Sequence, residues 1–483
     1  MYTLASIRRD VLSKFAGEVI SRLVFLLFFF WVGRKLQAAD FGSLNLAISA
    51  TYMLGVLFLD PGLNLSTIQM LVERPQDAKQ IAGSVFLAKL LLFFPLLFVL
   101  WGMSRGLGSR LPCFFTLFLA ALYALFTVVL EYLSSVTNAF HRMDLEAFLK
   151  IFNRVLIVIF GVLALRHGHI SALLFSMLAA TLFACVLAWG VLAGRLIRVI
   201  PQWHLDAIRE SFRRGLPIAG TSIATTIYLN WDLLVLSYFN INREQIGWYA
   251  AGFKIVVAFS AFPTMLGSAL FPMMVQLQKR DPEMLDRLLG LSTKAMLLFA
   301  LPLAAIVSVL SGKIVLLVYG AKYLSGANVL AILIWSIVPI FVYFYLVFVN
   351  IAAGHARYNL LAGFVALIAG LGCNAILVPR IGYLGAAWSA LAANATFALL
   401  ATWNVCRLFP NASLPAVLLR LTTAGCTLAT VIFFAPASPP VQLLLGLVAY
   451  FIVLVALGTL GAGDLSLAIR LIGSRTQPQG QQP

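Results

Sequence analysis

Long apolar runs, separated by short polar turns, follow one another along nearly the whole chain. An α-helix rises 1.5 Å per residue, so about 20 apolar residues cross the hydrocarbon core of a membrane. Divided at the polar turns, the runs predict about fourteen such helices. Their centres lie near residues 23, 55, 92, 125, 158, 183, 227, 262, 300, 340, 368, 396, 427 and 451. The expected fold is therefore all-α, a polytopic membrane protein.

Composition supports this class and excludes several others. A mean hydropathy of +0.98, with 62% hydrophobic and 11% charged residues, excludes an ordinary soluble domain. The net charge of +17 does not indicate a nucleic-acid partner, because the cations are scattered singly through short loops. The five cysteines stand far apart, without CxxC or Cys/His pairing, and there is no Walker loop. We expect no metal, no cofactor, no direct use of ATP and no catalytic residues.

The distribution of Lys and Arg predicts the orientation. With the N-terminus inside, 22 of the 34 basic residues fall in cytoplasmic segments and nine in outer loops. Positive charge is enriched on the cytoplasmic side of membrane proteins, so we expect both termini in the cytoplasm. The remaining three, Arg22, Lys89 and Lys254, lie inside apolar spans. The first span also contains Glu18, and it does not resemble a cleavable signal peptide.

The chain resembles two copies of one unit. At an offset of 205 residues, Ser6-Ile7-Arg8-Arg9 aligns with Ser211-Phe212-Arg213-Arg214, and Gly42 aligns with Gly247. Further on, His141 and Arg166 align with His355 and Arg380 at an offset of 214. Two copies of six helices share one orientation, which predicts a pseudo-two-fold axis along the membrane normal and a central site. The expected parts are two lobes, 1–200 and 201–410, a peripheral helix pair at 411–472, and a disordered tail at 473–483.

Ionisable residues inside a membrane cost several kcal/mol, so each is a functional hypothesis. Asp232 is the strongest candidate for ion coupling, because a lone carboxylate there can load and release a cation. A static salt bridge with Lys254 is the alternative. Glu131 and Glu18 are weaker coupling candidates. Packing explains Glu131 equally well, and the alternative for Glu18 is that it neutralises Arg22, four residues on along the same helical face.

Helix breakers predict bends in two spans. Asp60-Pro61-Gly62 interrupts the second span, where we expect a hinge and where Asp60 could simply cap a helix. Pro263 and Pro272 predict bending in the eighth span. Lys89 is close enough to the cytoplasmic end of the third span to snorkel, so a place in the lumen is the less favoured reading.

Several phrases carry a family resemblance. FLDPGLNLSTIQMLVERPQDAK (58–79) and WDLLVLSYFNINREQIGWYAAGFKIV (231–256) resemble the second-helix and the seventh-to-eighth-helix signatures of the polysaccharide-repeat-unit flippases. LVYGAKYLSGANVLAILIWS (317–336) and NAILVPRIGYLGAAWSALAAN (374–394) resemble their late helices. These proteins belong to the superfamily of multidrug, oligosaccharidyl-lipid and polysaccharide exporters. The likeness covers most of residues 1–410.

The resemblance implies translocation of undecaprenyl-pyrophosphate-linked oligosaccharides across a bacterial inner membrane, for O-antigen, capsule or exopolysaccharide. A pyrophosphate needs cations along its path, and Arg22 and Lys254 are placed to hold it, with Lys89 as a third candidate. The expected partners are the lipid-linked oligosaccharide, membrane lipids, H⁺ or Na⁺ as coupling ion, and the polymerase and chain-length components; the chain itself is expected to be a monomer. The alternatives are a multidrug antiporter of the same superfamily and a membrane O-antigen polymerase or ligase.

Overall fold

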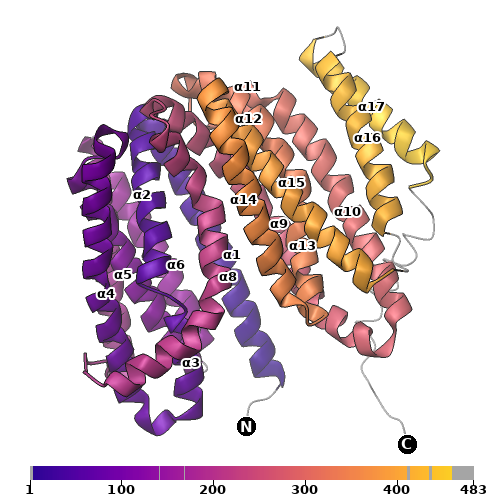
Figure 1. The fold of residues 1–483 in the computed structure, drawn as a ribbon. Helices are drawn as coiled ribbons and strands as arrows, with labels where there is room; N and C mark the ends of the chain where they lie inside the picture. Colours follow the sequence, from indigo (N-terminus) through magenta and orange to yellow (C-terminus); the bar gives the residue numbers. More distant parts are fainter. Residues whose placement is uncertain (1–3, 141, 168, 411–413, 435–437, 460–483) are drawn as a thin grey trace, which may run out of the picture. The chain divides into compact units, whose positions relative to one another are not determined.

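The computed structural model describes residues 4–140, 142–167, 169–410, 414–434 and 438–459, and no strand occurs within these ranges (Figure 1). Seventeen α-helices occur there: α1 (Leu4–Lys35), α2 (Ala38–Phe58), α3 (Leu63–Glu73), α4 (Ala78–Leu107), α5 (Phe114–Ala139), α6 (Met143–Ala164), α7 (Ile170–Arg195), α8 (Leu205–Tyr238), α9 (Arg243–Arg280), α10 (Pro282–Val309), α11 (Ser311–Val318), α12 (Ala327–Leu333), α13 (Ile337–Ala352), α14 (Ala356–Ile381), α15 (Tyr383–Leu408), α16 (Leu414–Phe434) and α17 (Pro439–Ala456).

The all-α prediction is confirmed, and every predicted span centre lies inside a helix. Among the described residues, ten helical segments are long and apolar enough to cross a membrane, and two shorter apolar helices follow them near the C-terminus. The helix count exceeds fourteen because the second span divides into α2 and α3 and because short helices precede α13. One of these, α11, has only eight residues.

The chain forms two compact units. The first contains residues 1–254, 315–329 and 370–389, and the second contains 255–314, 330–369 and 390–483. The division falls inside α9, directly after Lys254. The lobe boundaries drawn from the repeat stay a prediction, and the tail at 473–483 lies outside the described residues.

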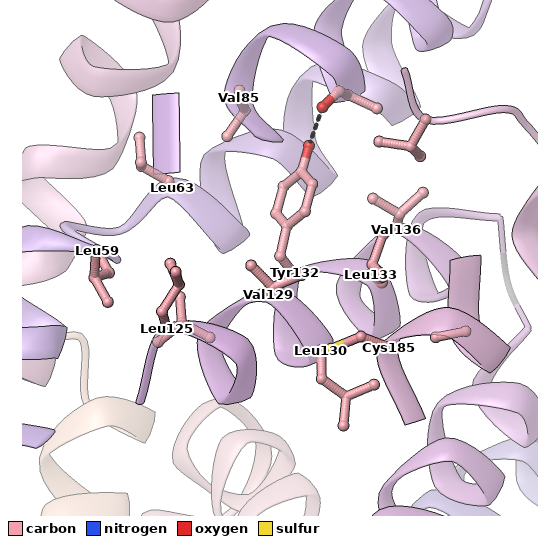
Figure 2. Close-up of a cluster of buried hydrophobic side chains, with 14 of the residues drawn as sticks. Leu59, Leu63, Val85, Leu125, Val129, Leu130, Tyr132, Leu133, Val136 and Cys185 are labelled. Carbon is pink, nitrogen blue, oxygen red and sulfur yellow. Dashed lines mark hydrogen bonds between the residues drawn. The ribbon is translucent and has the colours of Figure 1, made fainter. Parts of the chain in front are cut away.

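In the first unit, α5 supplies the centre of an apolar cluster (Figure 2). Tyr132 is fully buried there, and its hydroxyl donates to the Ala82 carbonyl of α4 at 2.7 Å. Lipid tails are as apolar as leucine, so close packing and internal hydrogen bonds, not burial from water, hold membrane helices together. A satisfied tyrosine hydroxyl inside an apolar cluster therefore joins α5 to α4. The labelled neighbours are Leu59, Leu63, Val85, Leu125, Val129, Leu130, Leu133, Val136 and Cys185.

The first turns of α2 and α9 cross with their backbones in contact. A Cβ atom on Gly247 would stand 1.9 Å from the Ala38 carbonyl oxygen, and one on Gly42 would stand 2.2 Å from the Arg243 carbonyl oxygen. Small residues allow this approach between membrane helices. Residues 38 and 243 occupy equivalent positions at the repeat offset of 205, and so do residues 42 and 247. The contact of Gly247 with Ala38 and the contact of Gly42 with Arg243 are therefore reciprocal, which is the pattern that a local two-fold axis produces.

In the second unit, α10 packs against α13, α16 and α17, and α16 packs along α17. A chain of buried amides runs through this unit. Asn404 donates to Asn350 at 2.9 Å, Asn350 donates to Asn359 at 2.8 Å, and Asn359 donates to the Val347 carbonyl at 3.1 Å. Because Asn350 and Asn359 each donate one bond and accept another, these buried groups stabilise the helix contacts at little desolvation cost.

Candidate functional site

A small cavity with polar and apolar walls lies in the first unit, at the crossing of α2, α8 and α9. Its volume of about 40 Å³ accommodates a few water molecules or one small ion. An oligosaccharide pyrophosphate does not fit in a space of this size. The lining residues are Asn45, Ser49, Asn230, Asp232, Leu233, Tyr249, Ala250, Phe253 and Lys254.

Asp232 is held in this cavity by neutral donors. It is 8% exposed, and its carboxylate accepts from the Tyr249 hydroxyl at 2.6 Å and from Asn374 Nδ2 at 3.2 Å. Within the described residues, Asp232 is bonded to Tyr249 and Asn374 and forms no ion pair with Lys254, which contacts Phe29 instead. Asn374 Oδ1 is buried without a hydrogen-bond partner among the described groups. The site thus offers a carboxylate and an amide oxygen to a cation.

Lys254 meets an aromatic ring instead of an acid. Its Nζ lies 4.6 Å from the centroid of Phe29 on α1. The Phe29 ring is 4.7 Å from that of Phe25, one turn earlier, and the guanidinium of Arg154 lies 4.0 Å from the Phe25 ring. Two cations from α9 and α6 therefore flank one aromatic pair. Cation–π contacts stabilise an ammonium or guanidinium in an apolar setting without neutralising its charge.

Arg22 is a third cation in this part of the chain and lies on α1, three residues before Phe25. Its side chain is exposed, and it interacts electrostatically with Tyr52 on α2, as Arg154 does. Sequence reasoning missed Arg154, which we counted with the cytoplasmic loops, whereas it lies midway along α6. The sequence feature that could have revealed it is the spacing of four residues between Lys150 and Arg154. This spacing places both on one face of the helix and continues that basic face into the membrane.

The structure corrects the prediction for Lys89. Its side chain is fully buried, so it does not snorkel. Its Nζ lies 2.9 Å from Asp60 Oδ1 and donates to the Leu59 carbonyl at 3.0 Å. Asp60 also accepts from the backbone N–H of Asn64 at 3.0 Å, which is the capping role considered from the sequence. Lys89 therefore binds the C-terminal end of α2 and does not line the cavity described above.

Residues 7–278, more than half of the chain, match the family described as polysaccharide biosynthesis protein. The chain belongs to this family. No curated protein matches it in sequence. The family resemblance read from the sequence is thereby confirmed.

Solved transporters share the fold of this family member. A lipid II flippase, MurJ, in an inward closed conformation aligns with a TM-score of 0.71 and 14% identity, over 92% of this chain and 97% of MurJ. An inward-facing multidrug resistance MATE transporter aligns with a TM-score of 0.63 and 14% identity, over 80% and 94%. The MATE transporter VcmN from Vibrio cholerae aligns with a TM-score of 0.52 and 17% identity, over 83% of this chain and 98% of VcmN. Together with the apolar helices, this fold identifies a multi-pass membrane protein.

The remaining predicted residues of this family member fall in different places. Glu131 lies on α5, and coupling and packing both stay predictions for it. The side chain of Glu18 lies outside the described part, and its role stays a prediction. α9 continues through Pro263 and Pro272 without interruption, so a hinge there also stays a prediction. α2 and α3, in contrast, are separated at Asp60-Pro61-Gly62, where Gly62 has a φ of +77° that favours glycine.

A charged cluster joins α3 to the polar first turns of α8. Glu210 accepts from Arg74 at 2.8 Å and from Arg214 at 2.5 Å, and Arg214 also donates to Glu73 at 2.6 Å. Partial burial opposes ionisation of Glu210, but the hydrogen bonds from the two arginines outweigh it and hold its pKa below the ordinary value. This cluster fixes the start of α8 beside α3 in the family member.

Proposed function

We propose that this protein is a flippase that carries undecaprenyl-pyrophosphate-linked oligosaccharide repeat units across a bacterial inner membrane by alternating access. Lys254 is the observation that carries the proposal. It is a cation inside an apolar helix, beside a small cavity, and the nearby acid Asp232 is bonded elsewhere. A charge kept inside an apolar helix is a functional hypothesis by default, and an anion is the ligand that complements an ammonium without an acidic partner.

The cations on α1, α6 and α9 are arranged for a pyrophosphate. Arg22 and Arg154 offer planar guanidinium groups, which match phosphate oxygens in pairs, whereas Lys254 offers a point charge. The aromatic pair Phe25 and Phe29 supports Arg154 and Lys254 without neutralising them. The 40 Å³ cavity must widen before a pyrophosphate enters, which is the opening that alternating access supplies.

Asp232 is the proposed coupling residue. A buried carboxylate that receives only neutral hydrogen bonds has a charge still to be balanced, either by a proton or by a monovalent cation. Na⁺ would also be bound by the unpaired oxygen of Asn374. Release of the ion on one side would then drive reorientation of the helices that hold Tyr249 and Asn374.

The charge distribution and the family support the proposed cellular setting. We place both termini in the cytoplasm and the protein in the inner membrane, as a monomer that hands its cargo to polymerase and chain-length components. The product would be O-antigen, capsule or exopolysaccharide. The similarity of fold to transporters, none of which is named as an enzyme, favours transport over a polymerase or ligase.

Complementation of a flippase-deficient strain tests the proposal. We expect the double substitution Arg22→Ala and Lys254→Ala to abolish surface polymer and to leave lipid-linked units on the inner leaflet. Arg105→Gln is the matched control, since it removes an exposed cation that lies 5.6 Å from the Trp101 ring. Full polymer output from the double variant would overturn the pyrophosphate site.

A multidrug antiporter is the second candidate, because Asp232 in a small cavity could also bind an organic cation. Proteoliposomes separate the two functions. A flippase moves a fluorescent lipid pyrophosphate and leaves a cationic dye in place, whereas an antiporter accumulates the dye. Asp232→Asn should abolish gradient-driven movement in either case, and unaltered coupling would leave Asp232 with a structural role only.

A further inference from the structure

Three basic side chains meet at the end of α1, and none of them belongs to the site described above. Arg34 and Lys35 lie in the last turn of α1. Lys322 comes from residues 317–326, which connect α11 to α12 and are called the strap below. The strap belongs to the first unit, as α1 does. Two segments that are 287 residues apart in the sequence therefore bring their cations to one place.

Aromatic contacts hold the strap against α1, α2 and α9. Tyr319 of the strap is fully buried, and its hydroxyl donates to the Ala251 carbonyl of α9 at 3.1 Å. Its ring centroid lies 5.7 Å from that of Phe30 on α1 and 5.9 Å from that of Phe41 on α2. The strap is therefore a packed part of the first unit, and this packing places Lys322 beside the end of α1.

The three cations contact carbonyl oxygens and a ring, and within the described residues no carboxylate pairs with them. Arg34 Nη1 donates to the Leu317 carbonyl of the strap at 3.1 Å. Lys322 Nζ donates to the Lys35 carbonyl of α1 at 3.2 Å. Lys35 Nζ lies 6.0 Å from the centroid of the Trp31 ring. The hydrogen bonds join the strap to α1 in both directions, but they do not neutralise the charges.

The charges near the end of α1 do not balance. The carbonyl end of a helix carries about half a negative elementary charge, which offsets part of one cation. Asp40, in the first turn of α2, attracts Lys322, whereas Lys35 repels it. Three cations, one acid and the helix end leave a net charge of about +1.5. Holding like charges together costs free energy, and a bound anion removes that cost.

The surroundings of the cations suit an anion that carries acyl chains. The candidate membrane spans that follow Lys35 and contain Lys322 begin at Ala38 and Ala321, so the cations lie at one boundary of the membrane. Leu317 and Leu324 of the strap are 74% and 48% exposed. Cations beside exposed apolar side chains match a phospholipid, because its phosphate lies at the membrane boundary and its chains lie in the hydrocarbon.

We propose that Arg34, Lys35 and Lys322 bind the phosphate of an acidic phospholipid, which clamps the strap onto α1. Arg34 offers a planar guanidinium, and the two lysines offer point charges. Because the phosphate attracts cations of both segments, it joins them. Without it, repulsion between Lys35 and Lys322 loosens the strap. With both termini in the cytoplasm, α1 ends at the outer face, so the lipid belongs to the outer leaflet.

Spin labels measure whether a lipid clamps the strap. Gln37→Cys, directly before α2, and Ser325→Cys, in the strap, replace exposed side chains in a background without the native cysteines. The labelled protein is placed in nanodiscs of phosphatidylcholine with increasing fractions of phosphatidylglycerol. We expect a short, narrow label distance with phosphatidylglycerol and a longer, broader distribution in phosphatidylcholine alone. Equal distributions in the two lipids would overturn the proposal.

Substitutions of the cations test the site itself. Among the described residues the Lys35 side chain contacts the Trp31 ring, so Lys35→Gln leaves both hydrogen bonds of the strap in place. One basic residue changes the affinity for an acidic lipid about fivefold. Lys35→Gln should therefore raise the phosphatidylglycerol fraction at half-closure about fivefold, and Lys35→Arg should restore it. The double variant with Lys322→Gln should lose the lipid response, and a response that persists in it would refute the site.

A matched control removes two cations elsewhere. Arg105→Gln with Arg166→Gln changes the net charge by the same amount at exposed positions, and Arg105 also lies beside a tryptophan, 5.6 Å from the Trp101 ring. This variant should close like the unsubstituted protein. Loss of closure in the control would assign the effect to the general surface charge and would remove the site.

Inorganic phosphate separates a free ion from a lipid headgroup. Added to phosphatidylcholine nanodiscs, it should leave the strap loose, because it lacks the chains that the exposed leucines contact. Closure by free phosphate would overturn the assignment to a lipid. The label distance is measured without any transported substrate, so this proposal does not depend on the proposed function, and either can fail alone.

Discussion

Adding one methyl group at Gly247 tests the crossing of α2 and α9. The new Cβ would stand 1.9 Å from the Ala38 carbonyl oxygen and 2.8 Å from the Ala38 carbonyl carbon. Carbon and oxygen normally approach to about 3.3 Å, so the two helices must separate by roughly 1.4 Å. Because both obstructing atoms belong to the backbone, no side-chain rotation relieves the clash.

The expected cost follows from two opposing effects. Overpacking a tight contact costs typically about 1–3 kcal/mol, and a backbone clash belongs at the upper end. Replacing a helical glycine by alanine recovers about 1 kcal/mol of helix propensity. Gly247→Ala should therefore lower the free energy of unfolding by about 2 kcal/mol. Gly190→Ala on α7 meets no atom within 4 Å and should raise it by about 0.5–1 kcal/mol.

Reversible unfolding of the purified protein by SDS, followed by circular dichroism, measures both changes. Gly42→Ala should act in the same direction, because its Cβ would stand 2.2 Å from the Arg243 carbonyl oxygen. The double variant should cost less than the sum of the single variants, since one separation of the helices relieves both clashes. A Gly247→Ala protein as stable as Gly190→Ala would refute the reciprocal contact.

Three shorter predictions concern single side chains. Tyr132→Phe leaves the buried Ala82 carbonyl without its donor and should lower the free energy of unfolding by about 1–2 kcal/mol in the same assay. The lowered pKa of Glu210 predicts that ionised Glu210 stabilises the folded protein above about pH 4.3, and that this stabilisation is lost as the pH falls through the pKa of Glu210 in the folded protein. Glu210→Gln should remove this acid dependence of the free energy of unfolding. An unchanged pH profile in the variant would contradict the prediction. Cys113 is exposed, and the hydrogen bond between its sulfur and Thr116 lowers the pKa of the thiol. A membrane-impermeant maleimide should therefore label Cys113 rapidly from the outer face of the membrane. Labelling only from the inner face would reverse the proposed orientation.

The helices were predictable because a membrane imposes one requirement on every span. Backbone groups in lipid must bond within their own segment, so a run of about 20 apolar residues becomes a helix whatever its neighbours are. The break at Asp60-Pro61-Gly62 was predictable for the opposite reason, because proline and a positive-φ glycine interrupt a helix locally. The helix α11 was not predicted, because its eight residues are too few to show as a span.

The site was less predictable, because contacts between spans depend on which face each helix turns inward. Asn374 bonds Asp232 from 142 residues away, and nothing local distinguishes it from other asparagines in apolar helices. Arg154 was assigned to a loop because it lies near the start of its apolar run. Its contact with Phe25 requires the packing of α6 on α1, which hydropathy does not report.

Lys89 and Lys254 show why a charge in a span does not by itself define a binding site. In the sequence both are single lysines in apolar helices, and both were candidates for the same lumen. In the structure, Lys89 contacts the Asp60 carboxylate and the Leu59 carbonyl because α2 ends beside it, so its charge is compensated within the protein. Lys254 faces the continuous helices α1 and α8, which offer a ring and an acid that is already bonded. Whether a buried cation serves the fold or a ligand is therefore decided by the helix next to it.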